Sequence, residues 1–301
     1  MEIKEGKDLL KDVRVEASKK ETEVLLKSFA EDKPVADKIR SLKLSRAQVK
    51  ENIGLVAAYK DDVDYCAHCP GLAACHKETP FYQSDLILKD GLLSRTYGPC
   101  ELYMHEQTIL GAYVYRDFPD EWLDLTPAIL SNSDRVIKVL IAFNKANGNK
   151  QNPWVYMTGE IGSGRSYLAA AFSNGCALQG QRVAFMNANK RFDELKGLAV
   201  ENKKVFDARL QELQAVSLLV IDDFGSEYKS DYVRDQIVMP LLTERAKRNL
   251  MTVFLSDYQP EEIETLYATT RSGAIMAKKL VGLIQSKIGG VTVVQKGVET
   301  L

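Results

Sequence analysis

The spacing of apolar and polar positions changes twice along this chain of 301 residues. Up to about residue 60, apolar side chains recur at helical spacing among charged ones, as at Leu9 and Val13 and again at Leu25 and Phe29. Ser45 stands where the N-cap of a further helix is expected. This pattern predicts a small bundle of helices with charged, solvated faces.

From about residue 65 to residue 100, short turns such as "KDG" and "YGPC" separate strand-like pieces. This segment contains little apolar material that it could bury. Four of the five cysteines of the chain lie in it: Cys66, Cys69, Cys75 and Cys100. A metal site can take over the stabilising role of a hydrophobic core, and tetrahedral zinc takes four soft ligands. We therefore predict a structural zinc site formed by these four cysteines.

Two alternatives stay open for this cluster. A histidine (His68, His76 or His105) could replace one thiolate, although His76 directly follows Cys75 and is better placed as a neighbour than as a ligand. The cysteines could also be free, or the C-x-x-C pair could serve in redox chemistry. With four protein ligands, a zinc ion would keep no open position for catalysis.

From about residue 131 onward, short apolar runs alternate with helical patterns. The runs are "WVYMT", "RVAFMNA", "SLLVIDDF" and "MTVFLSD", and the helical patterns include "SDRVIKVLIAFNKAN" and "YVRDQIVMPLLTERAKRN". This alternation predicts an α/β fold, a parallel sheet covered by helices on both faces. The expected organisation is a helical and zinc-binding domain over residues 1–104, a linker over 105–130, and the α/β domain over 131–301.

The sequence "GEIGSGRSY" joins the first of these strands to the helix after it. It fits the phosphate-loop pattern G-x-x-x-x-G-K-[ST], except that an arginine stands in place of the lysine. Glycines let backbone N–H groups turn toward an anion, and the start of the helix adds the positive end of its dipole. The predicted contacts to ATP or ADP are Gly159, Gly162, Ser163, Gly164, Arg165, Ser166 and Tyr167. Among them, Ser166 is placed to bind Mg²⁺.

Acidic residues follow two of the later strands. Asp222 ends the run "LLVID", where it is placed to hold the magnesium ion, and Asp223 is placed to orient or deprotonate the attacking water. Asp257 follows the strand "TVFLS", at a position where many such ATPases contact the γ-phosphate through a polar residue. The sequence therefore predicts a P-loop nucleotide site. In the alternative interpretation, Asp222 and Asp223 only cap the turn that follows the strand.

Four segments together resemble the bacterial replicative-helicase loaders of the DnaI/DnaC family, which are AAA+ proteins: "GEIGSGRSYLAAAFSN", "SLLVIDDFGSE", "YVRDQIVMPLLTER" and "TVFLSDYQPEEIE". The helices followed by C-x2-C-x5-C and a distant "YGPC" are similar to the zinc-bearing domain of such loaders. The resemblance covers nearly the whole chain. It implies an N-terminal domain that binds a hexameric DnaB-type helicase. It also implies an ATP-controlled AAA+ domain that contacts single-stranded DNA and can assemble with other copies on the helicase ring.

The departures from the family pattern fall on the groups that handle ATP. Arg165 keeps the charge of the lysine, but its planar guanidinium fits the β- and γ-phosphates less well. Asp257 stands where the family has asparagine and places an anion near the γ-phosphate. Ala274 and Lys278 occupy the positions of two family arginines that reach the nucleotide. We therefore expect ATP binding with weak or no hydrolysis.

The expected function is that of a helicase loader in the initiation or restart of DNA replication. It would bind the hexameric replicative helicase and deliver it to single-stranded DNA under ATP control. The alternative is an adaptor or inhibitor that binds the helicase without hydrolysing ATP. A transposition-helper ATPase is a further alternative, and the cysteine-bearing N-terminal part argues against it because that part resembles the loaders. A zinc-dependent nucleic-acid binder fits poorly with a formal net charge of −1.

The remaining expectations concern location and DNA. No apolar run approaches the ~18 residues of a membrane span, and the charged N-terminus lacks the apolar stretch of a signal peptide, so we expect a cytoplasmic protein without a membrane partner. Contact with single-stranded DNA would need local basic clusters. The candidates are residues 189–196, residues 201–204, and the group of Arg245, Lys247 and Arg248, although ordinary solvated helix faces explain each cluster better.

Overall fold

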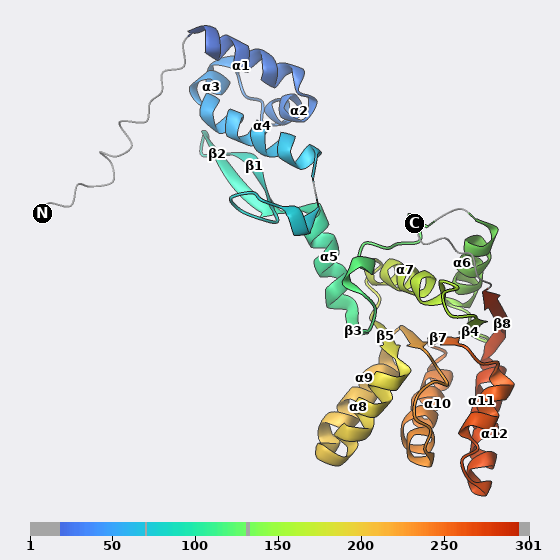
Figure 1. Cartoon of the computed structure of the whole chain (residues 1–301). Coiled ribbons are helices and arrows are strands. Elements are labelled where there is room, and N and C mark those ends of the chain that lie inside the picture. Colours follow the sequence, from blue (N-terminus) through green and yellow to red (C-terminus); the bar gives the residue numbers. More distant parts are fainter. Residues whose placement is uncertain (1–18, 70, 131–132, 295–301) are drawn as a thin grey trace, which may run out of the picture. The chain divides into compact units, whose positions relative to one another are not determined.

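The computed structural model of the chain describes residues 19–69, 71–130 and 133–294. Contacts divide the chain into two compact units, and the division lies after Met104 (Figure 1). The helical pattern predicted around Leu9 and Val13 lies outside the described residues. No helix in the described ranges combines the length and the apolar character that a membrane crossing requires.

The first unit consists of helices packed on a β-hairpin. Its elements are α1 (Lys19–Glu31), α2 (Lys33–Ser41), α3 (Arg46–Glu51), α4 (Ile53–Ala67), β1 (Tyr82–Lys89) and β2 (Leu92–Pro99). Apolar residues from the helices and the hairpin meet in one core that includes Phe29, Val56 and Leu86. The Ser45 hydroxyl caps α3 as predicted, since it accepts a hydrogen bond from the backbone N–H of Gln48 (3.3 Å).

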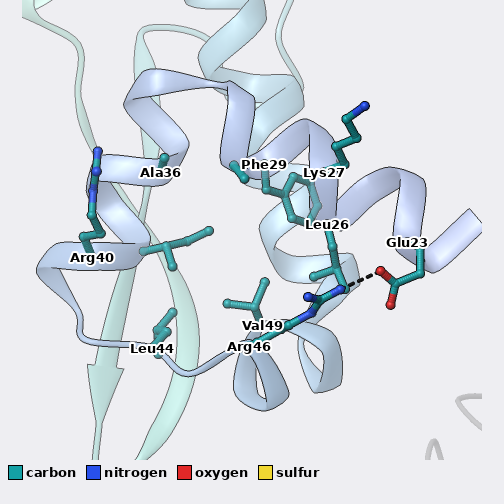
Figure 2. A pocket seen from close by; sticks show the side chains of 11 residues that line it. Glu23, Leu26, Lys27, Phe29, Ala36, Arg40, Leu44, Arg46 and Val49 are labelled. Atoms are coloured by element: carbon teal, nitrogen blue, oxygen red, sulfur yellow. Dashed lines mark hydrogen bonds and ion pairs between the residues drawn. The ribbon is translucent and has the colours of Figure 1, made fainter.

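Helices α1 to α3 surround a groove of about 770 Å³ (Figure 2). Apolar side chains line it: Leu26, Phe29, Ala30, Ala36, Ile39, Leu44 and Val49. Charged side chains also contribute to the lining, among them Lys27, Arg40 and an ion pair between Arg46 and Glu23 with an N–O distance of 2.6 Å. The first unit therefore presents an apolar hollow with charged neighbours.

The cysteine-bearing segment contrasts with the bundle. None of the described apolar residues from Lys60 to Gln83 is buried. Between α4 and β1, the regular structure of the described residues is a short 3₁₀ turn, η1 (Leu72–Ala74). Later in the predicted segment of residues 65–100, Leu86 and Leu93 of the hairpin are buried, and both pack in the core that is shared with the helices.

A parallel sheet of six strands forms the centre of the second unit, in the order β3-β5-β6-β7-β4-β8. The strands are β3 (Tyr113–Arg116), β4 (Trp154–Gly159), β5 (Val183–Asn187), β6 (Leu218–Asp222), β7 (Met251–Ser256) and β8 (Ile288–Val294). The four apolar runs of the sequence correspond to β4 to β7, as predicted. Two further strands, β3 and β8, form the edges.

Helices cover both faces of this sheet (Figure 1). On one face lie α6 (Asp134–Ala146) and α7 (Arg165–Leu178). On the other lie α8 (Ala188–Glu201), α9 (Lys203–Ala215), the π-helix η3 (Val233–Val238), α10 (Met239–Arg248), α11 (Pro260–Tyr267) and α12 (Arg271–Lys287). Successive strand residues alternate between the two cores, as Tyr156 and Met157 do. The predicted α/β architecture is confirmed.

Residues 105–130, which the sequence analysis assigned to a linker, contribute to the second unit. They include most of α5 (Glu101–Ala112), the edge strand β3 and the short turn η2 (Asp120–Trp122). Phe118, Leu123 and Leu125 are buried in the core that also holds α6 and α7. The folded unit therefore begins well before the first strongly periodic helix.

Candidate nucleotide-binding site

The predicted site residues meet at one edge of the sheet. In parallel strands all carboxyl ends reach the same edge, and here Thr158 of β4 pairs with Ser256 of β7 while Ile221 of β6 pairs with Phe254 of β7. The glycine loop after β4, the aspartates that end β6 and the residue after β7 are therefore neighbours. This edge is where doubly wound folds bind their ligands.

The glycine loop has the backbone of an anion-binding turn. Gly162 and Gly164 adopt left-handed conformations with φ of 81° and 83°, which other residues rarely tolerate. Gly164 is also the N-cap of α7 and offers no side chain to its N–H groups. The hydroxyl of Ser163 is buried and has no hydrogen-bond partner among the described residues. The loop therefore fits a phosphate group, which backbone N–H groups at a helix start can bind.

The side-chain oxygens of Ser166 and Asp222 lie side by side. The Ser166 hydroxyl donates a hydrogen bond to Oδ1 of Asp222 over 3.0 Å. Burial, together with the neighbouring charge of Asp223, raises the pKa of Asp222 to about 6. Such a pair suits a hard cation that binds oxygen, and this cation would offset the buried negative charge of Asp222. Ser166 and Asp222 are the residues that would hold Mg²⁺.

The raised pKa gives a testable expectation for the metal-free protein. The folded state holds the Asp222 proton more tightly than the unfolded chain, whose pKa is near 3.8, so this group stabilises the fold most below about pH 4 and loses that contribution as pH rises through 6. At about pH 7, Asp222→Asn should therefore raise the free energy of unfolding by ~2–3 kcal/mol. Urea unfolding with EDTA measures it, and the gain should vanish near pH 4. An equal gain at both pH values would contradict the expectation.

Asp223 is held by a residue that the sequence analysis did not single out. The side-chain amide of Asn187, at the end of β5, donates a hydrogen bond to Oδ2 of Asp223 over 2.7 Å. Asp223 itself has a left-handed backbone with φ of 56°. β5 and β6 are parallel neighbours, so the residue that ends β5 lies beside the residue that ends β6. The predicted order of strands and helices therefore indicates that Asn187 lies at this edge. Asn187 therefore fixes the carboxylate proposed to orient water.

Arg165 and Asp257 form an ion pair. The Arg165 guanidinium donates to the carboxylate of Asp257 and to the backbone carbonyl of Ser256. The side chain of Arg165 is only 10% exposed, and that of Asp257 is 36% exposed. The cation that occupies the lysine position thus points to the end of β7.

A buried network supports the turn after β6. Gly225 has φ of 93°, and a Cβ atom there would lie 2.5 Å from Cδ1 of Ile263, so glycine is required. The backbone N–H of Gly225 donates to the buried carboxylate of Glu227 (2.8 Å), which also accepts a hydrogen bond from the hydroxyl of Tyr267. The loop that follows the aspartates is therefore fastened to α11.

The remaining predicted residues have different surroundings. Tyr167 packs edge-on against Trp122 with ring centres 5.5 Å apart. Cys69 is exposed, and Cys66, Cys75 and Cys100 are half-buried: these are the predicted zinc ligands. In the described part of the chain, no three His, Cys, Asp or Glu residues are grouped so as to hold a metal.

Arg245 does not belong to the basic residues that could contact DNA. Its side chain is fully buried and donates to the carbonyl groups of Leu213, Val216 and Met251. The prediction that it could contact DNA is wrong, because the guanidinium binds main-chain carbonyls at the amino ends of β6 and β7. Lys247 and Arg248 remain on the surface.

Comparison with known proteins gives consistent matches. Residues 131–267 match a family described as IstB-like ATP binding protein. The chain is 20% identical over 241 residues to the replicative helicase loader DnaI of Bacillus subtilis (strain 168). This alignment covers 76% of each of the two chains. The chain is also 29% identical over 123 residues to the replicative helicase loader DnaC of Buchnera aphidicola subsp. Baizongia pistaciae (strain Bp). That alignment covers 40% of this chain and 50% of that loader.

A solved structure supports the fold. The crystal structure of DnaI aligns with a TM-score of 0.52 and 23% identity, over 64% of this chain and 98% of that one. At this identity the match speaks for the fold alone. It agrees with the helix-covered parallel sheet described above.

Proposed function

We propose that this chain, in which residues 131–267 form an IstB/DnaC-like AAA+ domain, is a loader of the replicative DNA helicase. The observation that carries the proposal is the similarity to a replicative helicase loader over 241 residues, a longer stretch than the ATP-binding family match. The glycine loop and the Ser166–Asp222 pair support nucleotide control of the loading step.

In this function each group at the sheet edge has one task. The loop from Gly159 to Tyr167 binds the phosphates through its N–H groups and the start of α7. Ser166 and Asp222 hold Mg²⁺, which neutralises phosphate charge when bound. Asp223, fixed by Asn187, orients water. Because Arg165 is paired with Asp257, hydrolysis is weak, and nucleotide serves mainly as a conformational signal.

The first unit binds the helicase in this proposal. Its groove has an apolar lining with charged neighbours (Figure 2), a surface that suits the apolar face of a partner helix. The AAA+ unit contacts single-stranded DNA, and several copies assemble on the helicase ring.

The test uses the full chain and the hexameric replicative helicase of the same organism. We expect a complex in size-exclusion chromatography with light scattering. We also expect faster unwinding of a substrate whose single strand is coated with binding protein. A complex without faster unwinding would favour the non-hydrolysing adaptor or inhibitor instead. The absence of a complex, with and without ATP, would contradict both.

We also propose zinc as a structural cofactor of the first unit. The cysteine segments are linked through residues 77–81: the Lys77 ammonium lies 3.5 Å from Sγ of Cys66, and the Cys100 N–H donates to the carbonyl of Phe81 (2.8 Å). Backbone N–H groups of Phe81 and Lys77 lower the pKa of Cys75 despite its partial desolvation. Zinc binding would draw the four thiolates together in a segment where no described apolar residue from Lys60 to Gln83 is buried.

Metal analysis tests this point. The purified chain should contain about one zinc ion, and Cys69→Ser should lose most of it, because three remaining thiolates bind zinc far less tightly than four. Cys176→Ser is the matched control, since Cys176 is buried in the AAA+ unit, and it should keep its zinc. Equal zinc content in all three proteins, measured by mass spectrometry, would contradict zinc binding by the cluster.

For single-stranded DNA we propose the surface where α8 approaches the loop after β6. The Lys196 ammonium lies 5.5 Å from the centre of the Tyr228 ring, and Tyr228 is 78% exposed. An exposed aromatic ring beside a cation is the arrangement on which unpaired bases stack. Tyr228→Ala should weaken binding of a fluorescent oligothymidine about 5-fold or more. Val200→Ala, at an equally exposed position of α8, should have no effect. Equal affinities for both variants would exclude this surface.

A further inference from the structure

The two unusual residues of the nucleotide site, 92 positions apart, contact each other. One nitrogen of the Arg165 guanidinium donates to Asp257, and another donates to the carbonyl of Ser256. The cation at the start of α7 is therefore shared between a carboxylate and a carbonyl at the end of β7. We propose that this ion pair makes the loop selective for a nucleoside diphosphate over a triphosphate. The proposal rests on the nucleotide site proposed above.

The selectivity follows from where charge is needed. In a phosphate loop, the backbone N–H groups cradle the first phosphates, and the cation of the loop reaches the β- and γ-phosphates. Here that cation is already neutralised by Asp257. A diphosphate can use the glycine loop and the start of α7 without it. A third phosphate has two options. It can displace the Asp257 carboxylate from Arg165, which breaks the ion pair, or it can lie close to that carboxylate, which places two negative charges side by side. Both arrangements are unfavourable.

The pair is also held in place from the β7 side. The Ser256 hydroxyl donates to the carbonyl of Phe224 (2.6 Å) and accepts a hydrogen bond from the N–H of Tyr258 (3.1 Å). Ser256 is buried, so the backbone on which Asp257 stands is anchored to the turn after β6. The loop that carries Asp257 is thus held in place, and the negative charge of Asp257 stays near the phosphate end of the site.

A purely architectural role for the pair makes a different prediction. If the ion pair only fastened α7 to β7, then Asp257→Asn would change stability and alter the affinities for ADP and ATP by the same factor. Selectivity built from an unfavourable interaction changes the ratio of the two affinities instead. The ratio is therefore the quantity to measure.

The experiment is calorimetric titration of the full chain with ADP and with ATP, both with Mg²⁺. In the natural chain we expect ADP to bind at least ~10-fold more tightly than ATP. Asp257→Asn should reduce this ratio to ~3-fold or less, through tighter ATP binding and unchanged ADP binding. Arg165→Lys/Asp257→Asn should behave in the same way. Asp207→Asn, which removes another partly exposed paired aspartate on α9, should keep the natural ratio.

A ratio that is unchanged in Asp257→Asn, while its thermal unfolding stays near that of the natural chain, overturns the proposal. Absence of ADP and ATP binding in every protein also overturns it, together with the nucleotide site. Complex formation with the helicase is measured separately, so a failure here is distinguishable from a failure of the loader function.

Discussion

Replacement of Arg245 by alanine should lower the free energy of unfolding by ~4 kcal/mol, which is a large part of the stability of a typical domain. The Arg245 side chain is fully buried in the second unit. It donates to the carbonyls of Leu213 and Val216 (2.8 Å each), to the carbonyl of Met251, and to the Thr252 hydroxyl (3.0 Å). Burial lowers its pKa to about 9, so it stays charged at neutral pH.

The cost arises because the acceptors remain when the guanidinium is removed. Each buried carbonyl that loses its donor costs about 1–3 kcal/mol, and the vacated volume adds to this. Chemical unfolding of the full chain measures the loss. The matched control is Arg248→Ala on the same helix: that side chain is 50% exposed and pairs with Glu244 at 2.8 Å, so we expect at most ~0.5 kcal/mol. Similar losses for the two variants would contradict the structural role of Arg245.

Replacing Arg165 by the lysine of the phosphate-loop pattern and Asp257 by asparagine should accelerate ATP turnover by on the order of 100-fold, because a cation that is free to reach the γ-phosphate stabilises the charge that develops there. The variant is Arg165→Lys/Asp257→Asn, measured by phosphate release under saturating ATP. The natural chain should turn over slowly, since its guanidinium is bound by Asp257 and Ser256. The gain should remain below the rate of an ordinary loader, because Ala274 and Lys278 still stand at the arginine positions.

The control adds Asp223→Asn to the same double variant. It should remove the gain, because the residue proposed to orient water is lost while the phosphate loop stays intact. A natural chain that already hydrolyses ATP as fast as the double variant would refute our interpretation of the substitutions. A gain that survives Asp223→Asn would place the activity elsewhere, for instance in a contaminating ATPase.

The sequence predicted the centre of the second unit well because its signals are local. The strands β4 to β7 are continuous apolar runs buried on both faces, and the loop after β4 carries a motif whose glycines have a specific backbone role. The edge strands β3 and β8 escaped detection, since β3 has four residues and only Tyr115 among them is buried. An edge strand pairs with only one other strand, so its run of apolar residues can be shorter and less regular than that of a central strand.

Long-range pairings were beyond the sequence analysis. Arg165 and Asp257 were each recognised as departures, but their contact depends on the order of strands in the sheet. Arg245 was grouped with surface cations although it follows Leu241 and Leu242 by one helical turn, on the buried stripe of α10. Helical periodicity could have identified it as an inward-facing residue.

The position of β3 has a consequence for how this module can be exchanged between proteins. The family match begins at residue 131, yet β3 pairs with β5, and Phe118 packs edge-on against Phe185 of β5 with ring centres 5.2 Å apart. A segment transferred from residue 131 onward would keep the pairing of β5 with β6 but would leave the other edge of β5 open to pairing with another chain. A transferable segment should therefore start near residue 105, where the second compact unit begins, so that β3 stays with the sheet it completes.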